Sequence, residues 1–255
     1  MTTPIGLQLY TLREAFGADF EGTIRQVAEM GYIGIEPWGG VMGDIAAKKK
    51  LYDDLGLTVT SVHYQLPIGE NKNKILDDMA ALGCGDLILP WIKPEHFASE
   101  DGVKTVAELL NEANEVGQAN GLTIHYHNHD FEFRDLNGRP AHQLLAELSD
   151  PAVKFQLDTY WIQVAGMDPA KVVREMGSRS PLLHIKDGPA DSREADMTAL
   201  GTGNMDIPAI VAAGGEHTQW LFVELDRCAT DMMTAVQESY TYLTSNGLAK
   251  GRTST

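Results

Sequence analysis

Residues 103–130 read VKTVAELLNEANEVGQANGLTIHYHNHD and contain a complete helix-to-strand unit. Five apolar residues recur at helical spacing within 103–119 and predict an amphipathic helix. They are Val106, Leu109, Leu110, Ala113 and Val116. Gly121 suits the left-handed residue that ends many helices, and the apolar run at 122–127 predicts a strand. This strand ends in a row of polar residues, His127, Asn128, His129 and Asp130.

The same alternation of helix and strand recurs along the whole chain. Short runs rich in Val, Ile, Leu, Tyr or Phe predict eight strands. They are residues 5–9, 32–36, 58–63, 86–89, 122–127, 153–158, 182–186 and 220–224. Helical patterns such as 20–30 and 232–243 lie between or after them, and Gly31, Gly56 and Gly83 mark further returns from helix to strand.

Strands separated by helices imply parallel pairing through right-handed crossovers. Eight such units predict an α/β protein with one (β/α)8 TIM barrel over residues 1–249, followed by a disordered polar tail over 250–255. An open doubly wound sheet is the alternative. No GxGxxG motif follows the first predicted strand, which disfavours the dinucleotide-binding version of that sheet.

Composition narrows the class of protein. The 255 residues carry 36 acidic and 20 basic side chains, a formal net charge of -16. Such acidity disfavours nucleic acid and anionic membranes as partners, because both require a basic surface. The two cysteines, Cys84 and Cys228, form no CxxC pair, and neither a secretory signal nor a membrane-spanning run is evident. We therefore expect a cytoplasmic enzyme or binding protein.

Ionisable side chains gather where the predicted strands end. They are Glu36, His63, His127, Asp158, His184, Lys186 and Glu224. In a barrel these strand ends converge on one mouth. Buried ionisable groups are costly unless they are paired or bound to a metal, and mixed nitrogen and oxygen donors suit transition metals. A single histidine could instead be a hydrogen-bonded core residue, and a single aspartate could be a helix N-cap.

Four segments carry a family resemblance: YHNHDFEF at 126–133, QLDTYW at 156–161, LHIKDG at 183–188 and FVELD at 222–226. They resemble the xylose-isomerase-like barrels known as sugar phosphate isomerases/epimerases, a superfamily that includes ketose 3-epimerases, inosose isomerases and dehydratases, and endonuclease IV. The resemblance implies one divalent ion held by four residues. Asp158, His184 and Glu224 fall on matching positions.

The fourth ligand position departs from the epimerases. They carry Glu there, whereas this chain carries His127, which is similar to the inosose dehydratase branch. His129 is the alternative ligand, because strand register is uncertain by a residue or two. The resemblance implies Mn2+ as the favoured ion, with Co2+, Mg2+, Zn2+, Fe2+ and Ni2+ as alternatives.

The resemblance implies a sugar or polyol isomerase/epimerase that works through a metal-stabilised enediolate, with Glu224 as a catalytic base. The histidine at 127 leaves open a lyase or dehydratase that eliminates water or an alcohol from a keto-inositol, a 3-keto-sugar or a 3-ketoglycoside. The acidic charge weighs against an abasic-site endonuclease. A non-catalytic sugar-binding barrel is a further alternative. The exact substrate, its phosphorylation and any homo-oligomer stay open.

Further residues are candidates for contacts with a small-molecule sugar or polyol. Lys186 lies two residues after His184, on the same side of its strand, so it could bind substrate or polarise a carbonyl. The alternative is a salt bridge from Lys186 to Glu224 or Asp158. His63 and Glu36 are candidate hydroxyl contacts or general acids. Trp38 and Trp161 could offer flat faces to sugar C–H groups or simply pack in the core.

Overall fold

The computed structural model describes residues 2–39 and 43–252. The unit expected at 103–130 forms as α5 (Glu100–Ala119) followed by β6 (Thr123–His127). Ser99 begins the helix, since its hydroxyl accepts a hydrogen bond from the backbone N–H of Gly102. Gly121 has φ +72°, the left-handed conformation that the chain needs to turn back into the strand. The apolar side of α5 is buried against the barrel.

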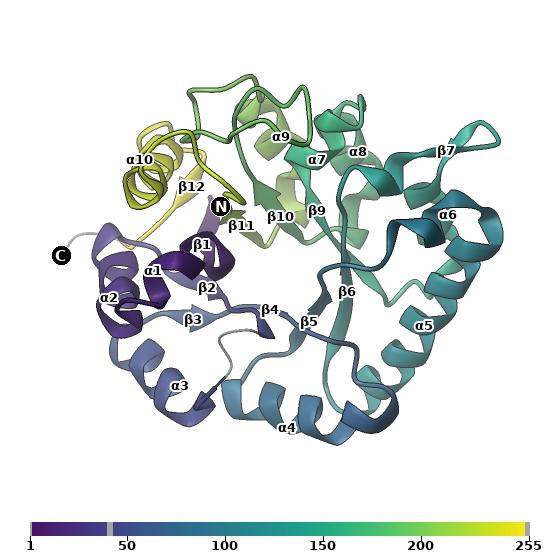
Figure 1. Cartoon of the computed structure of the whole chain (residues 1–255), viewed down its shortest axis with the longest axis horizontal. Coiled ribbons are helices and arrows are strands. Elements are labelled where there is room, and N and C mark those ends of the chain that lie inside the picture. The colour runs from purple at the N-terminus through teal and green to yellow at the C-terminus, as the bar shows by residue number, and fades with distance from the viewer. Residues whose placement is uncertain (1, 40–42, 253–255) are drawn as a thin grey trace.

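Parallel strands form the barrel (Figure 1). They are β1 (Thr3–Gln8), β2 (Gly34–Glu36), β3 (Thr58–Val59), β4 (Val62–His63), β5 (Asp86–Leu89), β6, β9 (Lys154–Asp158), β10 (Leu182–Ile185) and β11 (Trp220–Val223). Their hydrogen-bonded order is β3-β2-β1-β11-β10-β9-β6-β5-β4. β3 and β4 are two halves of the third predicted strand, and a bridge between Trp38 and His63 brings β4 beside the chain that leaves β2. This nearly closed arrangement confirms the predicted barrel.

Helices ring the barrel on the outside (Figure 1). Besides α5 they are α1 (Arg13–Phe16), α2 (Phe20–Met30), α3 (Ile45–Asp54), α4 (Lys72–Leu82), α6 (Ala141–Leu148), α7 (Thr159–Val164), α8 (Pro169–Met176), α9 (Ile207–Gly214) and α10 (Met232–Ser245). Aspartates begin many of them by accepting a backbone N–H in the first turn, at Asp19, Asp44, Asp168, Asp206 and Asp231. Among the described residues, no helix is long and apolar enough to cross a membrane.

The C-terminal segment differs from expectation. Residues 249 and 250 form β12 (Ala249–Lys250), which pairs in parallel with the start of β1. The backbone N–H of Arg252 donates to Gly31 O at 2.8 Å, and its guanidinium donates to Leu55 O at 2.6 Å. The disordered tail expected over 250–255 is therefore wrong for residues 250–252, because these pairings hold them. Residues 253–255 lie outside the described part of the chain.

The two long connections that follow β6 and β10 are both structured. Residues 131–140 contain the hairpin β7 (Asp135–Leu136) and β8 (Arg139–Pro140), which turns at Asn137-Gly138 with positive φ at both residues. The connection after β10 is held by the buried carboxylate of Asp187. Its oxygens accept backbone N–H groups from residues 188, 201, 203 and 205 at 2.8–3.1 Å.

An apolar layer closes the barrel below its mouth. Ile88, Leu182 and Phe222 form a buried cluster separate from the core between strands and helices. Gly6 and Gly34 leave room for aromatic rings inside the barrel. A Cβ at Gly6 would lie 2.7 Å from the Phe222 ring, and one at Gly34 would lie 2.5 Å from Trp220. Phe222 in turn lies under the His184 ring, 5.7 Å between centroids, so this layer is the floor of the site.

Candidate metal centre

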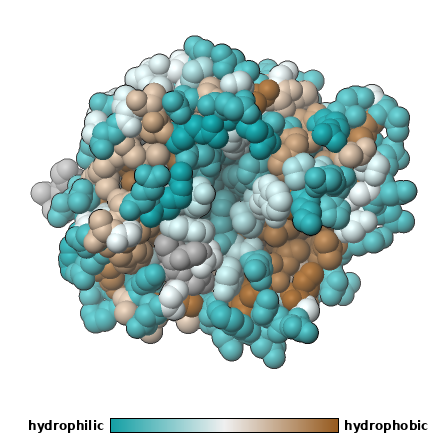
Figure 2. Space-filling model, in the orientation of Figure 1, coloured by the Kyte–Doolittle hydropathy of each residue, from teal (hydrophilic) through white to brown (hydrophobic). Residues whose placement is uncertain are grey.

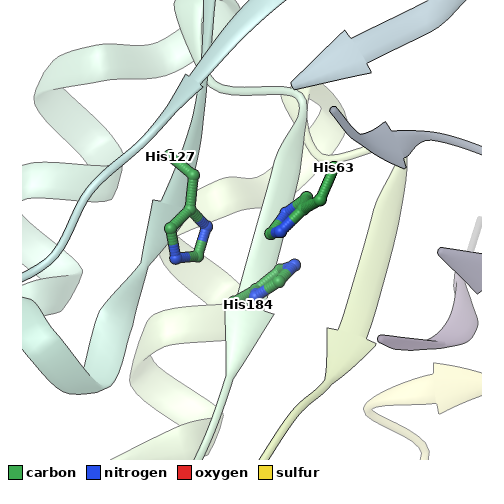
Figure 3. A group of neighbouring side chains, drawn as sticks. All are labelled: His63, His127 and His184. Atoms are coloured by element: carbon green, nitrogen blue, oxygen red, sulfur yellow. The ribbon is translucent and has the colours of Figure 1, made fainter. Parts of the chain in front are cut away.

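Four strands bring the predicted ligands together at the mouth. His127 ends β6 and Asp158 ends β9. His184 lies in β10 and Glu224 directly follows β11. The four side chains are buried, and one potential ligand atom from each lies within 4.8 Å of all the others. Figure 3 shows the rings of His127 and His184 turned toward the same space, with His63 of β4 beside them.

Asp158 is both a helix cap and a candidate ligand. Its Oδ1 accepts hydrogen bonds from the backbone N–H groups of Tyr160 and Trp161, each at 3.1 Å, and so begins α7. Its Oδ2 is buried, with Lys186 Nζ 2.8 Å away and His127 Nε2 3.7 Å away. Burial raises the pKa of Asp158, and Lys186 opposes this only in part. A divalent ion at Oδ2 would offset that cost.

Both ring nitrogens of His184 face carboxylates. Nδ1 lies 2.7 Å from Glu224 Oε2, and Nε2 lies 2.7 Å from Glu36 Oε1. Burial alone would lower the pKa of His184, but Glu224 and Glu36 raise it to about 10. Burial alone would also raise the pKa of Glu36, but His63 and His184 hold it well below its usual value. An ion bound at Nδ1 would replace the proton there, while Glu36 keeps the proton on Nε2.

Gln156 determines which nitrogen of the His127 ring carries the proton. Because Glu36 is an anion and only accepts hydrogen bonds, the amide Nε2 of Gln156 must donate to it, at 2.6 Å. The amide oxygen then faces His127 Nδ1 at 2.9 Å and His63 Nε2 at 2.7 Å. His127 therefore carries its proton on Nδ1 and leaves the Nε2 lone pair free. Burial, followed by the neighbouring histidines, lowers its pKa well below the usual value, so the ring is neutral.

Replacing Gln156 with Met should weaken metal binding by about 10- to 100-fold, the effect typical of losing a partner that orients a ligand. The volume is nearly kept, but His127 loses the acceptor that sets its tautomer. Competition with a fluorescent chelator measures the metal Kd. Gln163→Met is the control, because Gln163 is partly exposed on α7 and its amide donates to Asn204 O, at 3.4 Å, outside the ligand group. Equal Kd values for the two variants would contradict the assigned tautomer.

Lys186 occupies the centre of an acidic group. Its side chain is 1% exposed, and Nζ lies 2.7 Å from Glu224, 2.8 Å from Asp158 and 2.5 Å from Asp226. Burial alone would lower the pKa of Lys186, but Asp158, Asp226 and Glu224 raise it well above its usual value. The salt bridges expected as one alternative are therefore present. A contact between Lys186 and a substrate stays a prediction.

A cavity of about 660 Å³ opens over the ligand group. Figure 2 shows this face of the molecule hollowed near its centre, with hydrophilic residues on the floor. The described lining residues are Tyr10, Trp38, Gly39, His63, Tyr64, Gln65, Leu89, Pro90, Trp91, His127, His129, Glu224 and Asp226. Of the predicted substrate contacts, His63 and Trp38 line the cavity. Glu36, Lys186 and Trp161 are buried behind the lining.

His129, the alternative ligand, lines the cavity but stands apart from the four-residue group. Its ring stacks on Phe131, with 5.5 Å between centroids and 6° between planes. Its backbone N–H donates to the buried carboxylate of Glu132 at 2.8 Å. The geometry therefore favours His127 as the fourth ligand.

A comparison with known families identifies the chain's lineage. The family described as "Xylose isomerase-like TIM barrel" matches residues 24–225, which is most of the chain. This chain belongs to that family. Its matched region contains all four candidate ligands.

Individual relatives agree with this membership. A crystal structure of a sugar phosphate isomerase/epimerase from Parabacteroides distasonis ATCC 8503 superposes with a TM-score of 0.80 and 27% identity, over 98% of this chain and 96% of the other. The IOLI protein, with a bound zinc atom, shares the fold at a TM-score of 0.71 and 14% identity, over 97% and 98%. A 2-epi-5-epi-valiolone 7-phosphate 2-epimerase from Actinoplanes sp. (strain ATCC 31044 / CBS 674.73 / SE50/110) is 26% identical over 162 residues. That match covers 63% of this chain and little more than half, 56%, of the epimerase.

The donors of this xylose isomerase-like barrel fit a divalent ion. Two carboxylates and two imidazoles converge in a buried group, and each imidazole has a second contact that fixes its tautomer. Asp158 Oδ2 lies in the same group, 3.7 Å from His127 Nε2 and 2.8 Å from Lys186 Nζ. Mixed nitrogen and oxygen donors suit Mn, Fe, Co, Ni or Zn better than ions that prefer oxygen alone.

Several residues of the site were not predicted from the sequence. Gln156 sets the histidine tautomers, and Asp226 pairs with Lys186. Asn128 joins β6 to β9, because its side-chain amide both accepts from Asp158 N at 3.0 Å and donates to Asp158 O at 3.2 Å. Strand alternation could have found the first two, since each lies two residues from a ligand on the same face.

Proposed function

We propose that this protein is a divalent-metal-dependent isomerase or epimerase of a small sugar or polyol. The observation that carries the proposal is the buried group of His127, Asp158, His184 and Glu224 at the inner end of an open cavity. The names of the similar proteins from Parabacteroides and Actinoplanes support a sugar isomerase or epimerase. The acidic net charge of -16 supports a small molecule over nucleic acid as the partner.

The four residues would hold one ion, for which we propose Mn2+. Such an ion acts as a Lewis acid that stabilises negative charge developing on a carbonyl oxygen. We assign Glu224 as the base that removes the proton from the carbon beside that carbonyl. Burial alone would raise its pKa, but Lys186 and His184 hold it well below the usual value, so Glu224 is ionised. Both contacts go to Oε2, so Oε1 is the oxygen we assign to the proton.

His63 completes the inner end of the cavity. It lines the cavity, and its ring lies parallel to that of His184, with 5.4 Å between centroids and 8° between planes. Its Nε2 lies near Gln156 and Glu36, at 2.7 and 3.0 Å. We assign His63 to a hydroxyl of the sugar, next to the ligand group.

A lyase is the second candidate, because the placement of the acids in the cavity disfavours an epimerase that uses two bases. An epimerase that uses two bases needs one on each face of the sugar. The acids among the described lining residues are Glu224 and Asp226, and both follow β11. One-sided acids suit isomerisation by a single base or elimination of water or an alcohol. Exchange of the proton beside the carbonyl with solvent deuterium, without loss of water or aglycone, would exclude the lyase.

Removal of the metal tests the proposal directly. Protein treated with EDTA and dialysed should lose exchange of the proton beside the carbonyl, measured by NMR in D2O over a panel of ketoses, inososes and 3-ketoglycosides. One equivalent of Mn2+ should restore it, because the ion supplies the charge stabilisation. Elemental analysis checks the stoichiometry. Exchange at the untreated rate in metal-free protein would refute a metal-dependent reaction.

A further inference from the structure

The cavity is divided between the two halves of the barrel. Its inner end, beside the candidate ligands, is formed by strands of the second half together with His63. Its outer wall comes from the connections that follow the first strands. Tyr10 follows β1, Trp38 follows β2, Tyr64 follows β4 and Trp91 follows β5. The candidate metal ligands therefore lie on one side of the cavity, and the aromatic rings lie on the other.

The aromatic wall, formed by Tyr10, Trp38, Tyr64 and Trp91, is unusually open to solvent. Large exposed hydrophobic side chains among the described residues are Trp91 (50% exposed), Leu148 (41%) and Tyr10 (39%), and two of these three line this cavity. The Trp38 ring lies edge-on to the Tyr10 ring, with 5.5 Å between centroids, and stacks on the Phe16 ring, with 6.0 Å between centroids. These contacts support the rings that face the cavity. Exposed aromatic rings at a cavity typically mark a binding surface.

The described part of the wall offers no cationic side chain to a phosphate. No Lys or Arg occurs among the described residues that line the cavity, and residues 40–42, which lie outside the described part, are Gly, Val and Met. Arg13, at the start of α1, lies over the Tyr10 ring at 4.3 Å and donates to the backbone oxygens of Tyr10 and Asp226. Lys186 is buried among three carboxylates. A phosphate on this wall would have no Lys or Arg beside it among the described lining residues, and the acids of the lining, Glu224 and Asp226, would repel it.

We infer that the substrate is an unphosphorylated ketoglycoside, whose first ring carries the reacting carbonyl at the candidate metal centre while its second ring packs on Trp91 and Tyr10. This inference rests on the proposed function. A cavity of about 660 Å³ is in the range that encloses a drug-sized ligand, so it has room for more than one ring. Flat apolar faces are shared by an aromatic aglycone and a second sugar, and aromatic side chains pack against both.

Titration calorimetry on the Mn2+-loaded protein tests the inference. For several hexoses, whose glycosides lack the reacting carbonyl and therefore report binding without turnover, the methyl glycoside is compared with the phenyl glycoside, the disaccharide and the methyl glycoside 6-phosphate. We expect the phenyl glycoside or the disaccharide to bind about tenfold more tightly than the methyl glycoside of the same hexose, because the second ring buries apolar surface. The phenyl and disaccharide arms distinguish an aromatic aglycone from a sugar. The 6-phosphate should bind no more tightly than its parent.

Trp91→Ala and Tyr10→Ala should each reduce the preference for a second ring by about three- to tenfold, without changing the metal content. Leu148→Ala is the control, since Leu148 is comparably exposed but lies outside the cavity. Equal binding of methyl and ring-bearing glycosides, tighter binding of the 6-phosphate, or no binding of any ring-bearing compound would overturn the inference. The proposed function is judged separately, by whether EDTA abolishes proton exchange in wild-type protein.

Discussion

Asp158→Asn is expected to abolish metal binding while leaving α7 in place. Asparagine caps helices as well as aspartate does, so its side-chain oxygen can still accept the N–H groups of Tyr160 and Trp161. The amide nitrogen, however, replaces the anionic Oδ2 that faces the ligand group. We expect the metal Kd to rise by more than about 100-fold, because losing a ligand costs more than losing a ligand's partner. Proton exchange should fall by about 10³-fold or more.

Asp168→Asn is the matched control for this change. Asp168 begins α8 in the same way, with Oδ1 accepting the N–H of Lys171 at 3.1 Å, but it is exposed and is not among the four candidate ligands. It should leave metal content, exchange rate and thermal midpoint unchanged. Retention of a full equivalent of tightly bound metal by Asp158→Asn would remove Asp158 from the ligand set.

The barrel could be predicted from the sequence because its local signals agree with its topology. Each expected strand forms within a few residues of its predicted bounds, and α2 matches its predicted range. The incorrect prediction at the C-terminus concerns a strand pairing between residues far apart in the sequence, which a local pattern does not indicate. β12 forms because the start of β1 offers a free edge at residues 3 and 4, a partner nearly the whole chain away. The Asn137-Gly138 pair is a local signal from which the hairpin at 135–140 could have been predicted.

The site was less predictable than the fold. Convergence of strand ends follows from barrel geometry, so residues such as His127 and Asp158 could be grouped from sequence alone. Side-chain direction and depth could not. Glu36 was expected to touch substrate, yet it lies beneath His184 and orients it. Trp161 follows a ligand closely in sequence but packs behind Lys186, 5.4 Å from Nζ to the ring centroid.

Lys186→Met is expected to destabilise the metal-free protein by about 3–5 kcal/mol, the usual cost of leaving buried charges without their partner. The change keeps much of the side-chain volume but leaves Asp158, Glu224 and Asp226 without their shared cation. The pKa of Lys186 is raised in the folded protein. The stability that its charge contributes is therefore fully present below the pKa of an unfolded lysine, about 10.4, and is lost only at higher pH. The deficit is therefore measurable at pH 7, by urea unfolding in EDTA.

A bound ion should reduce this deficit, because it adds positive charge beside Asp158 and Glu224, two of the carboxylates that lose Lys186. Lowering the pH should reduce it as well, since protonating one carboxylate relieves the repulsion among the three. The control is Lys171→Met on α8, where an exposed pair with Glu175 at 3.8 Å contributes at most about 0.5 kcal/mol. If Lys186→Met unfolds at the wild-type urea concentration in EDTA, the three carboxylates do not depend on Lys186 for their charge balance. The electrostatic account of the metal centre would then fail at its central cation.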